Sequence, residues 1–72
     1  MGRQLPIQTD FIRLDALLKY ADLVSSGSEA KRLIGEGAIT INEEVCTMRG
    51  KKCRPGDVIK VRDIAITVTG DT

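Results

Sequence analysis

The spacing of the apolar residues changes once along this chain, at Gly37, and this change restricts the fold more than any other feature. Between residues 10 and 36 the apolar side chains recur at intervals of three and four, as in an amphipathic helix. After Gly37 they alternate with polar residues, as in half-buried strands. Helical segments followed by strands predict an α+β fold, in which two N-terminal helices pack on a small antiparallel β-sheet.

Two helices are expected before Gly37. The first is expected to begin after Thr9 or Asp10 as its N-cap, because an apolar stripe at helical spacing follows. That stripe consists of Phe11, Leu14, Leu17 and Leu18. The second is expected to begin after Ser26, whose side chain can accept from the amide of Glu29 while the Glu29 side chain returns to the amide of Ser26. This capping box predicts a helix that ends before Gly37.

Strands and turns are expected in the remainder. Asn42-Glu43 is expected to form a hairpin turn. Pro55-Gly56-Asp57 is expected to form a second turn, between segments in which apolar and polar residues alternate. Residues 1–9, with Pro6, are expected to form an extended N-terminal arm, and residues 10–72 a single domain.

Several classes of function are disfavoured by the residue types. The chain has no His and no GxSxG, P-loop or GxGxxG motif, so we expect no catalytic residues, no cofactor and no small-molecule substrate. Asp57 and Asp63 could pair as carboxylates, but both fit the role of turn formers. Cys46 and Cys53 cannot complete a four-ligand zinc site by themselves, so no metal is expected and both thiols are expected to pack.

The sequence also predicts a cytoplasmic protein without a membrane partner. No apolar run has membrane-spanning length, and the first residues lack the apolar core of a secretory signal. A disulfide across the gap between Cys46 and Cys53 is possible in principle, but a cytoplasmic chain is kept reduced.

Charge is distributed unevenly although the net charge is only +1. The segment from Arg49 to Arg62 holds six basic residues and one acidic residue, whereas the rest of the chain holds five basic and nine acidic ones. A second cluster, Lys31-Arg32, points away from the apolar stripe of the second helix. Each cluster alone could be an ordinary solvated surface, but the two together favour a polyanionic partner.

Four segments of the chain resemble the RNA-binding domain named after the fourth protein of the small ribosomal subunit, also called the αL RNA-binding motif. They are Arg13-Leu14-Asp15, Ser28 to Ile34, Gly37 to Asn42 and Pro55 to Ile59, in the order and spacing of that family. The resemblance is to its small stand-alone bacterial members. It implies a monomeric, ribosome-associated module that binds structured RNA, with ribosomal RNA as the candidate.

In that family the two helices and the loop leading into the sheet face the RNA. The resemblance therefore implies RNA-binding roles for Arg13, Lys31, Arg32, Arg49, Lys51, Lys52 and Arg54. The family often has Gly after the hairpin Asn. Here Glu43 and Glu44 follow, which predicts a different turn type and an edge that repels phosphate.

The expected mode of recognition is by shape and phosphate contacts. Phe11 and Tyr20 are the only aromatic residues, and with Phe11 assigned to the core there is no platform on which successive bases could stack. The sequence therefore predicts a non-catalytic RNA-binding module. The alternative is a protein-interaction adaptor with an acidic partner.

Overall fold

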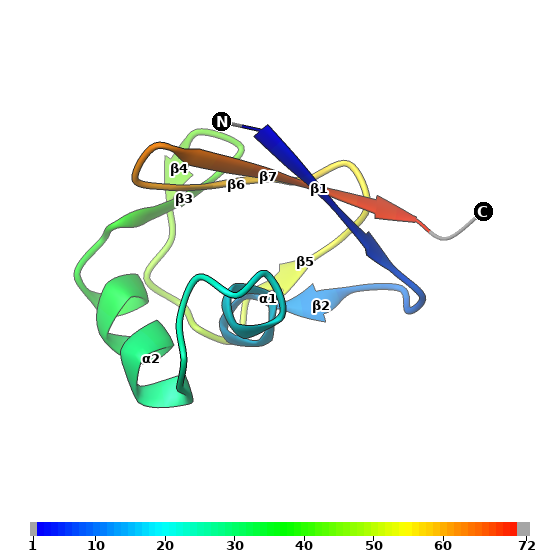
Figure 1. The fold of residues 1–72 in the computed structure, drawn as a ribbon. Coiled ribbons are helices and arrows are strands. Elements are labelled where there is room, and N and C mark those ends of the chain that lie inside the picture. Colours follow the sequence, from blue (N-terminus) through cyan, green and yellow to red (C-terminus); the bar gives the residue numbers. More distant parts are fainter. Residues whose placement is uncertain (1, 71–72) are drawn as a thin grey trace.

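The computed structural model describes residues 2–70, which form two layers (Figure 1). A five-stranded sheet makes one layer, and two helices with a two-stranded ladder make the other. In chain order the elements are β1 (Gly2–Ile7), β2 (Ile12–Arg13), α1 (Leu14–Tyr20), α2 (Gly27–Gly35), β3 (Ile39–Ile41), β4 (Glu44–Val45), β5 (Lys52–Cys53), β6 (Val58–Val61) and β7 (Ile64–Gly70).

The α+β class is confirmed, but the predicted sheet is only partly right. The strand order is β1-β7-β6-β3-β4, and the pairs β3/β4, β3/β6 and β6/β7 are antiparallel as expected. β1 pairs with β7 in parallel, so the sheet is mixed. Two strands, β1 and β2, precede the helices, which are therefore not the N-terminal elements.

The segment expected as an N-terminal arm is instead an edge strand of the sheet. Leu5 is half-buried and Ile7 is buried against the core, which is the alternation of a strand. Pro6 is compatible with this position because an edge strand has one side that needs no amide donor. The outer limits of the predicted arm and domain, residues 1 and 72, lie outside the described residues.

Helix α1 begins at Leu14, three residues later than the Phe11 start that an N-cap at Asp10 would require. Ile12 and Arg13 instead form β2, which pairs with β5. Thr9 caps no helix; its hydroxyl donates to the Phe11 carbonyl over 2.7 Å. Phe11 matched the helical spacing, but it precedes the helix and is only half-buried, so its assignment to the core is wrong.

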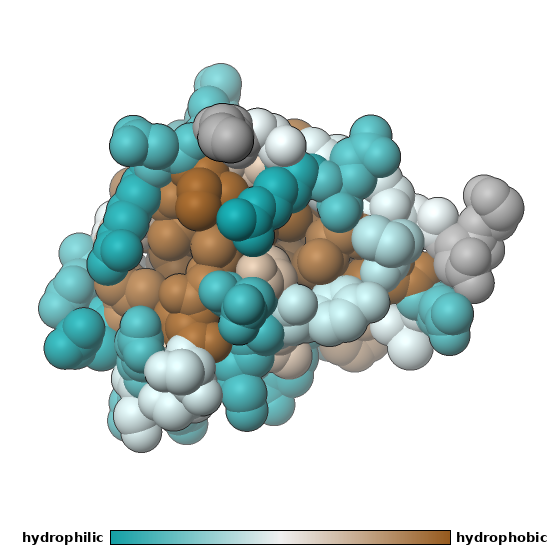
Figure 2. Space-filling model, viewed as in Figure 1, coloured by the Kyte–Doolittle hydropathy of each residue, from teal (hydrophilic) through white to brown (hydrophobic). Residues whose placement is uncertain are grey.

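The core lies between the two layers. The predicted stripe of the first helix is confirmed from Leu14 onward, α2 buries Ala30, Leu33 and Ile34, and the strands contribute alternate residues. The largest fully buried side chains are Leu14, Leu17, Leu18, Ile34, Ile39, Ile59, Ile66, Val68 and Cys53. Figure 2 shows hydrophobic residues in a band between the sheet and the helices, flanked by hydrophilic residues. Within residues 2–70 no polar or charged residue is buried.

The capping box of α2 is half confirmed. The Ser26 hydroxyl accepts from the Glu29 amide over 3.2 Å, as predicted. The Glu29 carboxylate, however, accepts from the amide and hydroxyl of Ser25, at 3.5 and 3.2 Å, and not from the amide of Ser26. The return contact is therefore shifted by one residue, but the helix still begins where its cap predicts.

Replacing Ser26 by alanine should lower the free energy of unfolding by about 1 kcal/mol, because the Glu29 amide loses its acceptor. Urea melts followed by circular dichroism would measure the change. Ser28→Ala is the matched control, since it alters an exposed serine of the same turn and should stay within about 0.5 kcal/mol. Coinciding melts of Ser26→Ala and the parent would contradict the capping role.

The hairpin turn differs from its prediction. Asn42 and Glu43 have φ angles of 51° and 73°, so both occupy the left-handed region typical of a two-residue hairpin. The expected change of turn type is therefore wrong. The Asn42 side chain holds the turn in place, because its amide donates to Asp57 over 3.1 Å and its oxygen accepts from the Val58 amide over 3.0 Å.

The second predicted turn is confirmed at Pro55-Gly56. Gly56 has a φ of 101°, and the Asp57 amide donates to the Arg54 carbonyl over 2.9 Å. The Asp57 carboxylate also accepts from the Arg54 amide over 2.9 Å. Asp57 therefore fills the turn-forming role, and it ties the second turn to the hairpin turn.

Neither helix in the described part of the chain is long and apolar enough to cross a lipid bilayer.

Candidate nucleic-acid interface

The β2–β5 ladder presents basic side chains on its outer face. Ile12 pairs with Cys53 and Arg13 pairs with Lys52. Cys53 is fully buried and Ile12 packs against the core, so this pair faces inward. Side chains alternate along a strand, and the exposed pair Arg13 and Lys52 therefore faces outward.

Phe11 is on this outer face as well. It lies two residues before Arg13, and the Lys52 ammonium sits over its ring, 4.9 Å from the centroid. A cation within about 6 Å of a ring centroid is attracted to the ring face. Sequence reasoning missed this contact because it assigned Phe11 to a helix. The available signal was the two-residue interval between Phe11 and Arg13, which fits a strand.

The basic loop before β5 is docked onto the start of α1. The carbonyls of Lys51 and Arg49 accept from the amides of Leu14 and Asp15, over 2.9 and 3.1 Å. These contacts satisfy amides that a helix leaves unpaired in its first turn. The loop that carries Arg49 is therefore held by backbone contacts and does not depend on its exposed side chains for its position.

Arg13 connects the loop and the ladder. Its guanidinium lies against Gly50, where a Cβ atom would be 3.6 Å from Nη2. The same Nη2 donates to the Asp15 carboxylate over 3.3 Å, and the other oxygen of Asp15 accepts from the Ala16 amide over 2.8 Å. The structure thus brings the predicted site residue Arg13 together with Lys52 and the 49–51 loop.

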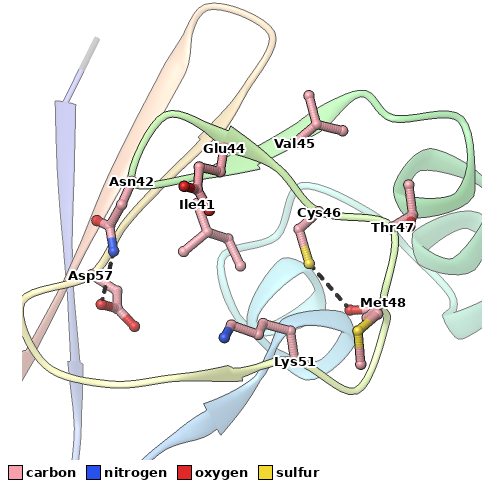
Figure 3. A pocket seen from close by; sticks show the side chains of 9 residues that line it. All are labelled: Ile41, Asn42, Glu44, Val45, Cys46, Thr47, Met48, Lys51 and Asp57. Carbon is pink, nitrogen blue, oxygen red and sulfur yellow. Dashed lines mark hydrogen bonds between the residues drawn. The ribbon is translucent and has the colours of Figure 1, made fainter.

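Lys51 lies on a different side from Lys52. It lines a groove of about 550 Å³, in which Figure 3 shows its side chain directed toward Asp57. The other lining residues are Ile41, Asn42, Glu44, Val45, Cys46, Thr47 and Met48. Lys51 is exposed at this groove, and the carboxylates of Glu44 and Asp57, which line it too, would oppose a phosphate there.

The remaining predicted site residues are exposed but are not part of the ladder. Lys31 and Arg32 are exposed on α2, whereas its stripe is buried, as expected for side chains that point away from the stripe. Arg32 forms an ion pair with Glu36 at the long distance of 4.0 Å. Arg54 is exposed at the start of the turn that Asp57 closes.

The two thiols occupy different environments. Burial raises the pKa of the Cys53 thiol from 9.0 to about 11, with smaller contributions in the same direction from Asp57 and Cys46. Both cysteines are free, and Cys46 lines the groove of Figure 3, where its thiol donates to the Met48 carbonyl over 3.6 Å. Among residues 2–70 no group of three or more metal-ligating side chains is assembled.

Cys53 should resist alkylation in the folded protein. At pH 8 a thiol with a pKa of about 11 is a thiolate in about one molecule in a thousand, and burial also keeps the reagent away. Iodoacetamide should therefore label Cys46 alone at pH 8, and both thiols in urea, as read by peptide mass spectrometry. Equal labelling of both thiols in the folded protein would contradict the assigned burial.

Comparison with known proteins identifies one family and several relatives. The S4 domain family model matches residues 5–69. A probable ribosome maturation protein, RlbA of Bacillus subtilis, is 36% identical over 61 residues, which cover 85% of this chain and 86% of that protein. The small ribosomal subunit protein uS4 of Gloeothece citriformis is 38% identical over 52 residues, which cover 72% of this chain. A Wolbachia uS4 is 34% identical over 56 residues. The chain spans only 26% and 28% of the lengths of these two uS4 proteins.

Proposed function

Because this chain belongs to the S4 domain family, we propose that it binds structured RNA through backbone phosphates. This proposal rests on one observation. Arg13, Lys52 and the loop that carries Arg49 lie together at one place on the surface. Backbone pairing and helix capping hold these residues near one another, so their arrangement does not need a ligand. Cations held in this way suit a polyanion.

The acidic charge of the hairpin edge supports an RNA interface on the ladder side alone. Glu43 and Glu44 are exposed there, and Asp57 lies in the adjoining groove. Carboxylates repel phosphate, so the RNA would contact the ladder side and avoid the hairpin. The predicted site residues on α2, Lys31 and Arg32, would extend the contact beyond the ladder.

The names of the relatives indicate the class of RNA that we propose for this chain. Their names describe ribosomal proteins and a probable ribosome maturation protein. We extend this to the present chain as binding of ribosomal RNA in the bacterial cytoplasm, with no catalytic step. The chain has one Phe, one Tyr and no Trp, and the Phe ring carries the Lys52 ammonium, which favours recognition of shape and phosphates over stacked bases.

The proposal can be tested by fluorescence anisotropy with a hairpin RNA at several salt concentrations. Contacts to four or more phosphates should give a plot of log affinity against log salt with a slope of about −3 or steeper. A pull-down from bacterial lysate, divided into ribonuclease-treated and untreated halves, gives an independent measurement. Salt-independent binding, or associated material that survives ribonuclease, would favour a protein partner and contradict the proposal.

A further inference from the structure

Arg13 and Lys52 are placed where like charges ordinarily weaken a sheet. They are direct partners across β2 and β5, and the ladder contains only one other pair, Ile12 with Cys53. Like charges directly opposite each other on antiparallel strands repel, because their side chains leave the same face at close range. An anion between the two side chains would therefore be attracted by both of them.

We propose that Arg13 and Lys52 form a subsite for a single phosphate group, an inference that rests on the proposed binding of RNA. A phosphate seated between them receives donors from both the guanidinium and the ammonium, and the repulsion between the cations becomes attraction to a shared ligand. The chemical class of the ligand is a phosphodiester of the RNA backbone. Inorganic phosphate is the smallest probe of the same chemistry.

Both cations of the subsite are held in position by neighbouring groups. The Phe11 ring carries the Lys52 ammonium at 4.9 Å, and Asp15 holds the Arg13 guanidinium at 3.3 Å against Gly50. Long basic side chains lose rotamer freedom when they bind a ligand, and side chains that are already restrained lose less. Phe11 and Asp15 are therefore positioning residues of the subsite.

The negative charge of the Asp15 carboxylate does not prevent an anion from binding at the subsite. Its two oxygens are engaged by the Arg13 guanidinium and the Ala16 amide. The guanidinium has five N–H donors, and the ion pair with Asp15 leaves others for a phosphate. Two cations against one carboxylate leave a net positive charge at the ladder.

The other basic residues lack this arrangement. Lys51 is directed toward Asp57, and Arg32 faces Glu36. Lys60, which lies in β6, has the uncharged residues Thr40 and Ala65 as its cross-strand partners. Lys60→Gln is therefore a matched control, because it removes the same charge from a strand lysine that has no basic partner opposite.

Titration with inorganic phosphate at constant ionic strength, followed by amide chemical shifts, tests the subsite without RNA. In the parent we expect saturable shifts confined to residues 11–15 and 49–53. Arg13→Gln and Lys52→Gln should each abolish them, whereas Lys60→Gln should retain them. Unchanged spectra in the rest of each variant verify its fold. Shifts that are absent from the parent, or that persist in both subsite variants, would overturn the proposal.

A mutant cycle tests the positioning role of Phe11. Phe11→Leu should weaken binding of a hairpin RNA by about threefold to tenfold, whereas Phe11→Tyr, which keeps a ring face for the ammonium, should bind like the parent. In a Lys52→Gln background Phe11→Leu should have no further effect on affinity. An equal loss in both backgrounds would show that Phe11 acts independently of Lys52, and the positioning role would be wrong.

The two experiments separate the inference from the proposed function. Full RNA affinity in Arg13→Gln and Lys52→Gln would overturn the subsite while leaving RNA binding in place. Localised phosphate shifts in a parent that binds no structured RNA would support the subsite and contradict the RNA-binding function.

Discussion

Changing Arg49 and Lys52 together to alanine should lower the affinity for structured RNA by about a hundredfold at low salt. A hydrogen bond to a charged group contributes about 1.5–3 kcal/mol, which is at least about tenfold per contact. The slope of log affinity against log salt should also fall in magnitude by about two, since two fewer phosphates are neutralised. Anisotropy titrations at four salt concentrations would measure both quantities.

The control for this pair is Lys60→Ala with Arg62→Ala, which removes the same charge from the five-stranded sheet and its adjoining turn. Lys51→Ala adds a second comparison, because Lys51 is directed into the groove toward Asp57 (Figure 3). We expect both controls to lose much less affinity than the Arg49/Lys52 pair. Equal losses would mean that net charge alone governs binding, which would contradict a localised interface.

Leu14→Ala should have the largest effect on stability. Leu14 is fully buried, and removing such a side chain from a core typically costs about 2–5 kcal/mol. A domain of this size has a total stability of roughly 4–11 kcal/mol, so the variant should be partly unfolded at moderate temperature. Its amide still donates to the Lys51 carbonyl, so the loss measures packing and not the docking of the loop.

Urea melts of Leu14→Ala and Lys19→Ala would test this expectation. Lys19 is exposed on the same helix, and its replacement by alanine should change stability by less than about 0.5 kcal/mol. A loss below about 1 kcal/mol for Leu14→Ala would contradict the position of this side chain in the core.

The elements that the sequence predicted correctly are those with local signals. α2 has a capping serine and an apolar stripe, and the turn at Pro55-Gly56 contains residues suited to turns; at Asn42-Glu43 the position of the turn was predicted correctly but not its type. β1 and β2 have partners far away in the chain, β7 and β5, and a strand of two residues has no measurable periodicity. Their pairing could therefore not be predicted, and β2 was mistaken for the start of a helix.

The same limit applies to the candidate site. Basic residue types and their clustering identified the segments, because charge can be counted in a sequence. Whether Lys51 or Lys52 faces outward depends on the register of β2 against β5, which only the fold determines. The contacts of Phe11 and Asp15 with the two outward cations depend on that register as well.

The parallel pairing of β1 with β7 also determines the order in which the molecule can be assembled. β1 is synthesised before β7, the strand with which it pairs, which spans Ile64–Gly70, so its hydrogen bonds must wait until that segment has left the ribosome. Closing so long a loop carries an entropic cost before the contacts are gained, and such contacts slow folding. We therefore expect the last step of folding to follow synthesis of β7, and ribosome-bound chains that stop before residue 64 to remain sensitive to protease.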